Sequence, residues 1–321
     1  MKVLITGGLG FIGSNLSKKL VERGDEVIII DNLMKDYGGN LYNICNFSDS
    51  ISLHICDIRN IDELKRHLNK VDIIFNLASQ IGHYFSIQNP IEDLDINTVA
   101  QLNFLELIRK ICPEALIIYT STRQVYGIPI YKPVDEKHPI NPPDINGINK
   151  FAAEQYHLLY HRIHNLKTVV LRLTNTYGPR MRIKDSRQTF LGIWIRNLIE
   201  GKVIQVFGDG KQKRDFNYVD DVIDALILSS ENERAIGRVF NIGSNTIMPL
   251  SDLATEICKL KKGSKWSLVP FPKDKKAIDI GNYYSDFSLA NNLLKWEPKT
   301  SLKDGLKKTL NFYNKNLKHY I

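Results

Sequence analysis

The sequence predicts an α/β protein whose mostly parallel sheet is covered by helices on both faces. Three observations lead to this fold class. Short apolar runs alternate with helical segments up to Arg180, and beyond it the alternation breaks. The first apolar run is followed by regularly spaced glycines, and the second ends in an aspartate. We therefore expect a Rossmann-type, doubly wound sheet with a smaller, interleaved C-terminal α/β lobe that binds the substrate.

The N-terminal region contains every part of a dinucleotide-binding βαβ unit. Residues 2–5 are mostly apolar, as in a buried parallel strand. Gly7, Gly10 and Gly13 would allow a sharp turn, the approach of a pyrophosphate to the helix N-terminus, and close helix–strand packing. Any tight turn can use glycines, but here a helical run, a second strand and Asp31 follow in the required order. The Asp31 carboxylate would bind an adenosine ribose hydroxyl and repel a 2′-phosphate, so NAD is expected rather than NADP.

Two further strands continue the sheet and add expected cofactor contacts. They span residues 52–55 and 71–78, with a helix between them over 61–68. Asp57 follows the first of these strands, where an acid faces adenine or forms an ordinary surface turn. The expected cofactor site therefore extends to residues beside the glycines and after the strands: Phe11, Ile12, Asn32, Asp57, Ile58, Leu77 and Ala78.

Residues 79–86 are expected to form a loop at the carboxyl end of the strand over 71–78. Doubly wound sheets bind their ligands at this edge. His83 lies in the loop, and its imidazole either faces the ligand or bonds only to solvent or backbone. The sequence leaves both possibilities open.

The rest of the chain supplies the outer strands and the second lobe. Further elements are expected as helices over 91–112, 147–164, 188–200, 250–260 and 302–316, and as strands over 116–119, 168–173, 204–207 and 238–243. Residues 175–180 are expected to form a loop. We expect an NAD-binding domain over 1–180, to which 204–243 partly returns, and a mainly substrate-binding lobe over 181–321. The cleft between two such lobes is the usual place for a substrate.

Composition indicates a globular protein without membrane or nucleic-acid contacts. The chain has 321 residues, 43% of them hydrophobic, and a net charge of +8. No apolar run is as long as a membrane span, and the nucleotide-binding strand starts where a signal peptide would lie, so a cytoplasmic protein is expected. The lysines lack interleaved aromatic residues, so no nucleic-acid partner is expected, whereas a phosphate-bearing substrate suits the charge. The four cysteines lack metal-ligand spacing and are expected to be reduced thiols, with no metal site.

Motifs later in the chain complete a pattern of specific order and spacing. After the glycines and Asp57 come N-L-A at 76–78, Thr122 with Tyr126-Gly127, Lys150, Asn175 with Tyr177-Gly178-Pro179, G-D-G at 208–210 and R-D-F at 214–216. Over essentially the whole chain, this pattern resembles the extended short-chain dehydrogenase/reductase family, and within it the NAD-dependent sugar-nucleotide epimerases and dehydratases. The resemblance implies transient oxidation of a nucleotide-linked hexose. A hydride leaves a sugar carbon for NAD, a base takes the hydroxyl proton, and the ketone permits inversion or elimination before the hydride returns.

The resemblance also assigns the proton chemistry, with one departure. In such enzymes a Ser or Thr hydroxyl bonds to the reacting oxygen, a Tyr is the base, and a Lys lowers the pKa of the Tyr and holds the nicotinamide ribose. Thr122 and Lys150 match the first and last of these. The Tyr position, four residues before the Lys, is Asn146, and none of the fourteen tyrosines has a lysine four residues on. A carboxamide cannot act as a base near neutral pH.

Three explanations for Asn146 remain open. In the first, another group replaces the base: His83, or else Tyr126, which the family usually packs under the loop. In the second, Asn146 orders a water with Thr122 and Lys150, and this water relays the proton. In the third, the oxidation step is lost and the protein only binds NAD or a nucleotide sugar.

A second departure concerns the type of reaction. Sugar-nucleotide 4,6-dehydratases typically carry an Asp–Glu pair directly after the Thr, but this chain has Arg123 and Gln124, which cannot act as an acid/base pair. The sequence therefore favours an epimerase similar to UDP-glucose 4-epimerase. A dehydratase or oxidoreductase that uses another base is the alternative. Arg123 is expected either to form a salt bridge or to contact substrate or phosphate.

The resemblance implies further substrate contacts and an oligomeric state. Asn175 and Arg214 match positions that hold the diphosphate, and Lys276 falls where the family often has a second Arg. Residues 205–207 resemble the segment that packs along the nucleoside base. The two long helices match a pair through which the family commonly forms dimers, so a homodimer is expected. Their apolar residues are Phe104, Leu105, Leu107, Ile108, Phe151, Tyr156, Leu159 and Tyr160.

Overall fold

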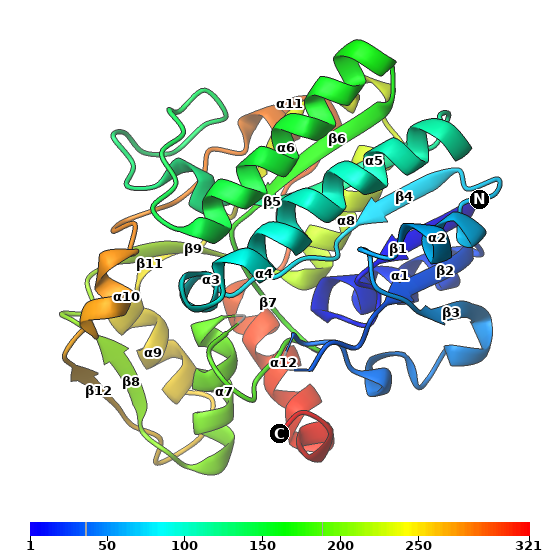
Figure 1. Ribbon diagram of the computed structural model, residues 1–321. Helices are drawn as coiled ribbons and strands as arrows, with labels where there is room; N and C mark the ends of the chain where they lie inside the picture. The colour runs from blue at the N-terminus through cyan, green and yellow to red at the C-terminus, as the bar shows by residue number, and fades with distance from the viewer. Residues whose placement is uncertain (36, 188) are drawn as a thin grey trace.

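A seven-stranded parallel sheet forms the centre of the computed structural model, which describes residues 1–35, 37–187 and 189–321 (Figure 1). The strands are β1 (Lys2–Thr6), β2 (Glu26–Asp31), β3 (Ile51–Ile55), β4 (Ile73–Asn76), β5 (Leu116–Thr122), β6 (Lys167–Leu173) and β10 (Val239–Ile242). They lie in the order β10-β6-β5-β4-β1-β2-β3, and every neighbouring pair is parallel. The order reverses between β1 and β4, where doubly wound sheets bind ligands. The predicted Rossmann-type fold class is confirmed.

Helices bury both faces of this sheet. On one face, α1 (Phe11–Arg23) packs against α8 (Val219–Ser230). On the other, α5 (Ala100–Ile111) and α6 (Ile145–His164) lie side by side (Figure 1). Phe104 of α5 belongs to a separate apolar core with residues of β1 and β4. Strands that are buried on both faces need near-continuous apolar sequence, which explains the short apolar runs.

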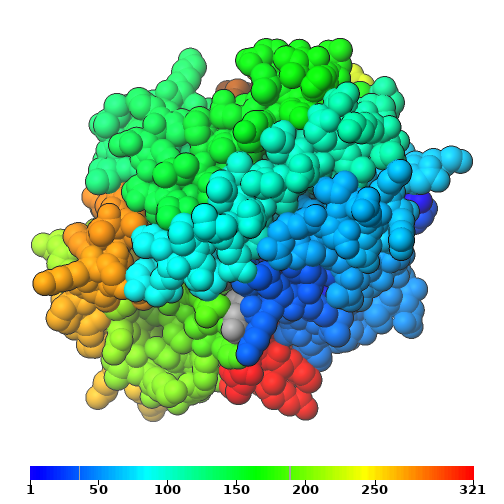
Figure 2. Space-filling model, viewed as in Figure 1, coloured from blue at the N-terminus to red at the C-terminus, as the bar shows by residue number. Residues whose placement is uncertain are grey.

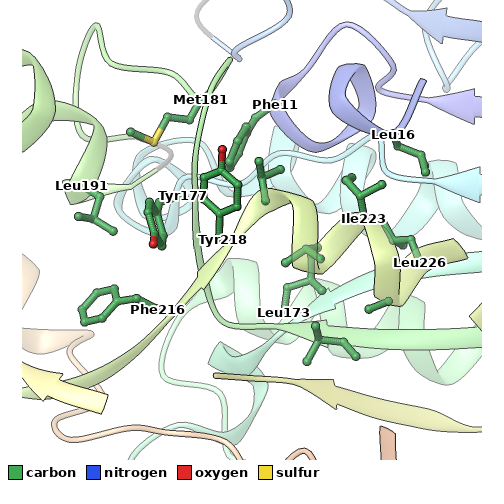
Figure 3. Close-up of a cluster of buried hydrophobic side chains, with 14 of the residues drawn as sticks. Phe11, Leu16, Leu173, Tyr177, Met181, Leu191, Phe216, Tyr218, Ile223 and Leu226 are labelled. Carbon is green, nitrogen blue, oxygen red and sulfur yellow. The ribbon is translucent and has the colours of Figure 1, made fainter. Parts of the chain in front are cut away.

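The smaller lobe contains two short sheets and several helices. The sheets are β11 (Ile247–Pro249)-β9 (Lys213–Tyr218)-β7 (Asn175–Tyr177) and β12 (Trp266–Val269)-β8 (Ile204–Phe207). The helices are α7 (Phe190–Glu200), α9 (Leu250–Cys258), α10 (Lys273–Ala277) and α12 (Leu302–Asn316), whereas α11 (Ser288–Leu294) packs against β10 and α8 of the main domain. Tyr177, Tyr218 and Leu191 share one apolar cluster with Phe11 and Leu16 of α1, so the lobe and the sheet have a common core (Figure 3). No helix in the described ranges is both long and apolar enough to span a bilayer.

Several elements differ from the sequence-based expectations. The expected loop over 79–86 contains α3 (His83–Gln88), and the expected loop over 175–180 begins with β7. β7 exists because it pairs with β9, a contact between distant segments that local sequence does not reveal. The expected helix over 91–112 is α4 (Pro90–Leu94), a π-helical turn and α5. The expected helix over 61–68 is α2 (Ile61–Leu64) followed by a 3-10 turn, and of the helix over 188–200 the first residue, Gln188, lies outside the described residues.

Candidate functional site

A cavity of about 900 Å³ opens at the carboxyl ends of the strands and extends into the second lobe. This volume is at the upper end of the range for small-molecule sites. Its wall includes the β1–α1 turn, the ends of β2, β4 and β5, and parts of α7, β8 and α10. Every residue that the sequence analysis assigned to cofactor, substrate or catalysis lines it, except Lys276, the alternative base Tyr126 and, within the segment 205–207, Val206.

The glycine turn has the shape that a pyrophosphate requires. Gly7 has φ +70°, and a Cβ there would lie 3.0 Å from the Ala78 backbone. A Cβ on Gly13 would overlap the carbonyl oxygen of Gly7. Side chains at these positions would therefore force the turn and helix α1 apart. The backbone is left open for a phosphate at the N-terminus of α1.

Two carboxylates mark the adenosine end of the cavity. The Asp31 side chain accepts hydrogen bonds from the backbone N–H groups of Leu9 (3.0 Å) and Leu33 (2.9 Å), which fix its orientation. Asp57 accepts from Arg59 Nη2 at 2.7 Å and from Asn32 Nδ2 at 2.7 Å. The hydrogen bonds from Arg59 lower the pKa of Asp57 to about 2, so it stays ionised. The glycine turn and Asp31 together fit the pyrophosphate and ribose of NAD.

Thr122 and Lys150 lie at the inner wall. Thr122 ends β5, and its Oγ1 accepts a hydrogen bond from the Gln124 N–H at 3.2 Å, which leaves the hydroxyl hydrogen free to be donated. Lys150 Nζ donates to the Thr120 carbonyl at 2.9 Å and lies 4.9 Å from the centre of the Tyr119 ring. Burial lowers the pKa of Lys150 to about 8. A buried ammonium therefore faces the place predicted for the nicotinamide ribose.

Replacing Lys150 by methionine is expected to weaken NAD binding while raising the free energy of unfolding at pH 7 by about 1–3 kcal/mol. The pKa of Lys150 is lower in the folded state than in the unfolded chain, so folding releases a proton between about pH 8 and 10. Wild-type stability should then rise with pH through this window, and the difference from Lys150→Met should shrink. Urea denaturation at pH 7 and pH 9.5 measures this. A constant difference at both pH values would contradict it.

Asn146 connects three elements. Its Nδ2 donates to the Gln80 carbonyl at 2.8 Å and to Asp93 Oδ2 at 3.1 Å, and its side chain is buried. Asp93 also accepts from Asn149 Nδ2 at 2.8 Å. Both amide hydrogens of Asn146 are thus used to hold α6 against α4 and the segment before α3. A water beside Asn146 could hydrogen-bond only to the carboxamide oxygen of Asn146, because both amide hydrogens of Asn146 already have acceptors.

His83 begins α3 and faces the same cavity. Its Nδ1 lies 3.1 Å from Asp144 Oδ2, within ion-pair distance, although the N–H does not point along the line between them. Asp144 caps α6 by accepting from the Gly147 N–H at 2.7 Å, and it also accepts from Gln124 Nε2 at 2.8 Å. Burial alone would raise the pKa of Asp144, but His83 and these hydrogen bonds hold it below its usual value. The structure therefore places an ionised carboxylate behind the imidazole.

Tyr126 cannot reach a substrate, so the prediction of Tyr126 as an alternative base is wrong. Its ring is fully buried and does not line the cavity. Its hydroxyl accepts from Arg172 Nη1 at 2.6 Å and donates to Asn241 Oδ1 at 2.7 Å. Burial raises the pKa of Tyr126 to about 12. Tyr126 is a structural anchor beneath the turn that follows Thr122.

The predicted diphosphate contacts lie on the second-lobe side. Asn175 and Arg214 line the cavity, and Arg214 Nη2 donates to Asp279 Oδ1 at 3.0 Å. Lys276 does not line it: its ammonium lies 5.1 Å from the centre of the Phe271 ring, and the neighbouring Lys275 faces the cavity instead. The structure therefore does not place Lys276 at the cavity, where the resemblance predicted a substrate contact.

Two residues at the site were missed by the sequence analysis. Asp144 could have been identified as a helix N-cap, because it directly precedes the helix and aspartate is a preferred residue at this position. Its side chain accepts a hydrogen bond from the N–H of Gly147, three residues later. Its contact with His83 joins segments that are far apart in the chain and has no local signal. Ser121 lines the cavity with a buried Oγ that has no hydrogen-bond partner within the described residues. It is available to a ligand.

Comparisons with known proteins show the family to which the chain belongs. Residues 3–243 match the NAD dependent epimerase/dehydratase family. CDP-paratose 2-epimerase of Salmonella typhi is 32% identical to this chain, and the match covers 96% of this chain and 98% of the relative. UDP-glucuronic acid decarboxylase 1 of Arabidopsis thaliana is 33% identical, and the match covers 95% of this chain and 68% of the relative. The structure of UDP-glucose 4-epimerase from Thermotoga maritima with UDP-glucose is 31% identical, has a TM-score of 0.88, and matches over 99% of this chain and 100% of its own. The chain therefore belongs to the NAD-dependent epimerase/dehydratase family of enzymes, and the glycine-lined end of its cavity fits the cofactor NAD.

Proposed function

We propose that this enzyme is a sugar-nucleotide epimerase similar to UDP-glucose 4-epimerase, which transiently oxidises a UDP-linked hexose with His83 as the base. One observation carries the proposal. His83, with Asp144 at 3.1 Å from its imidazole, lines the same cavity as Thr122 and Lys150. Similarity to a UDP-glucose 4-epimerase and to a CDP-paratose 2-epimerase supports the reaction class.

Each of these side chains has a distinct task in the proposed reaction. His83 accepts the proton of the sugar hydroxyl, and the Asp144 carboxylate stabilises the imidazolium that forms. The Thr122 hydroxyl donates a hydrogen bond to the same oxygen. The Lys150 ammonium holds the nicotinamide ribose and contributes positive charge beside the reacting oxygen. The glycine turn, Asp31 and Lys150 would hold NAD, which when bound would supply the hydride acceptor for the oxidation and the hydride donor for the return step.

The surroundings of Gln124 favour epimerisation over dehydration. Elimination of water needs an acid/base pair beside the sugar. Gln124 donates instead to Asp144 and to the Ile278 carbonyl, at 2.8 and 3.2 Å, and Arg123 carries no acidic proton at neutral pH. No acid/base pair therefore follows Thr122.

Proton NMR of UDP-hexoses incubated with the NAD-loaded enzyme in deuterated water tests this proposal. An inverted sugar without carbon-bound deuterium supports hydride removal and return at one carbon. Loss of water with deuterium uptake would contradict the proposal in favour of a dehydratase.

The competing function is binding of NAD and a nucleotide sugar without turnover. It is favoured by Asn146, whose amide group occupies the expected position of the catalytic tyrosine and is engaged by Gln80 and Asp93. Unchanged sugars in the NMR experiment, from a sample shown to bind both ligands, would support it. Turnover that appears only in Asn146→Tyr would confirm that the chemistry was lost with the tyrosine.

We further propose that the enzyme forms a homodimer through α4, α5 and α6. The residues that support this dimer are not the ones named in the sequence analysis. Phe104, Leu105, Leu107 and Ile108 are buried in the core of the single chain, so they cannot form a dimer face. The exposed large apolar side chains on these helices and the π turn are instead Ile91 (67% exposed), Leu94 (38%), Val99 (44%) and Ile148 (53%), with Ile111 (37%) and Ile163 (54%) at the C-terminal ends of α5 and α6. α4 and α5, in cyan, lie open on the face shown in Figure 2. Apolar groups gathered on a helix pair are typical of a subunit interface.

Replacing Ile148 by aspartate is expected to convert the dimer to a monomer, because a charge in the centre of an apolar interface would lose its water. Light scattering after size-exclusion chromatography measures the mass. Ile130→Asp, at a residue that is 73% exposed in a loop away from these helices, is the matched control and should remain dimeric. A wild-type protein that is monomeric at micromolar concentration would contradict the proposal.

A further inference from the structure

Arg123 is a cation at the cavity wall without an anionic partner. It directly follows Thr122, and its guanidinium lines the cavity. Nη2 donates to the Asn175 side-chain oxygen at 3.0 Å, and the guanidinium carbon lies 5.5 Å from the centre of the Tyr283 ring. Over residues 1–35, 37–187 and 189–321 no carboxylate lies within ion-pair distance of Arg123. The salt bridge considered for Arg123 in the sequence analysis is therefore absent from the described chain.

The carboxylates that attract Arg123 from beyond ion-pair distance, Asp215, Asp279 and Asp144, each accept a hydrogen bond from another donor, although Asp215 Oδ1 has no hydrogen-bond partner within the described residues. Asp279 Oδ1 accepts from Arg214 Nη2 at 3.0 Å, and its Oδ2 accepts from Gln212 Nε2 at 2.6 Å. Asp215 is fully buried, its Oδ2 accepts from the Ser285 N–H at 3.2 Å, and burial raises its pKa to about 6. Arg123 and Arg214 also repel each other. A partly desolvated guanidinium with one neutral acceptor is unfavourable unless a ligand supplies negative charge.

The two neighbours of Arg123 indicate which part of a substrate it meets. In the proposed function, Thr122 bonds to the reacting sugar hydroxyl and Asn175 lies at the diphosphate. Arg123 follows Thr122 in the chain and is hydrogen-bonded to Asn175, so it lies between these two points. The hexose ring spans the same interval. The group that faces Arg123 is therefore a substituent of the sugar.

A carboxylate suits this position better than a hydroxyl. The guanidinium is planar and can donate two parallel hydrogen bonds to the two oxygens of a carboxylate. With its one side-chain hydrogen bond made to Asn175, four of its five N–H groups remain for other acceptors. We propose that Arg123 binds a carboxylate carried by the hexose, so that the preferred substrate is a UDP-linked hexuronic acid. This inference rests on the proposed function, because it assumes a UDP-sugar in the cavity.

Calorimetric titration of the NAD-loaded enzyme with UDP, UDP-glucose and UDP-glucuronic acid tests the inference. The two sugars differ only at C6, so the ratio of their Kd values isolates the carboxylate. We expect the wild type to bind UDP-glucuronic acid about 10- to 100-fold more tightly than UDP-glucose, as charge-assisted hydrogen bonds allow. Arg123→Gln should bring the ratio to about one without changing the Kd for UDP, whereas Arg123→Lys should retain part of the preference.

Other outcomes would overturn the inference in distinguishable ways. Equal Kd values for both sugars in the wild type would refute a carboxylate site and leave the epimerase proposal standing. An equal loss of affinity for UDP and both sugars in Arg123→Gln would assign Arg123 to the diphosphate instead. If the wild type bound none of the three ligands, the proposed function would fail and the inference with it.

Discussion

Replacement of His83 by alanine is expected to lower kcat for sugar interconversion by about 10²- to 10⁴-fold, the usual contribution of a positioned general base. The physical reason is that His83 lines the same cavity as Thr122, and the Asp144 carboxylate at 3.1 Å can stabilise the imidazolium that forms. Binding of NAD should change little, since the glycine turn and Asp31 lie at the other end of the cavity. NMR-monitored turnover and calorimetric titration with NAD measure the two quantities.

Two companion variants separate proton transfer from positioning. His83→Gln can still donate a hydrogen bond to Asp144 but cannot accept a proton as a base, so it should be as inactive as His83→Ala. Asp144→Asn keeps the cap of α6 through its side-chain oxygen but removes the charge behind the imidazole. It should retain part of the activity, with a modest loss of thermal stability, because its amide nitrogen cannot accept the hydrogen bond from Gln124. Near wild-type turnover in His83→Gln would contradict the role of His83 as the base.

Replacement of Glu154 by glutamine is expected to cost about 3–5 kcal/mol of the free energy of unfolding, because it leaves a buried arginine without its counter-ion. Arg172 Nε donates to Glu154 Oε2 at 3.0 Å, Arg172 Nη2 makes a second contact with Glu154 Oε1, and both side chains are almost completely buried. Arg172 in turn donates to the Tyr126 hydroxyl beneath the Thr122 turn. Urea denaturation should therefore show a large loss of stability, accompanied by reduced activity.

The control for this prediction removes both charges. Glu154→Leu combined with Arg172→Leu takes away the buried ion pair and should recover much of the stability, since paired charges in a low-dielectric core contribute little net free energy. Activity should remain low in the double variant, because Tyr126 has lost the donor that holds it. A Glu154→Gln protein with wild-type stability would show that Arg172 finds another acceptor.

The cofactor end of this protein could be predicted from sequence because it is local. A strand, a glycine turn, a helix and a second strand ending in Asp31 are contiguous, so their spacing alone specifies the geometry. The C-terminal helix Leu302–Asn316 was also predicted with its observed bounds, because its apolar face repeats at helical spacing.

The catalytic end could be predicted only in part, because it is assembled from distant segments. His83 was identified from its place after a strand, but its helix α3 and its contact with Asp144 were not. Phe104 was predicted to lie at a dimer interface because it is apolar, but it is buried in the core of the single chain. The sequence cannot distinguish burial within a chain from burial between chains. Lys275 lines the cavity and Lys276 does not, because neighbouring residues of a helix project in different directions, and the resemblance did not distinguish the two.

Chemical rescue of His83→Ala by imidazole tests the central claim most directly. The NAD-loaded variant is incubated with the UDP-sugar that the wild type converts, and the initial rate is measured against imidazole concentration by NMR. If His83 is the base, free imidazole should enter the space left by the side chain and restore turnover in proportion to its concentration. 1-Methylpyrazole, which has a similar shape but is far less basic, should not. A variant that binds NAD and the sugar normally but whose rate does not respond to imidazole would contradict the assignment of the base.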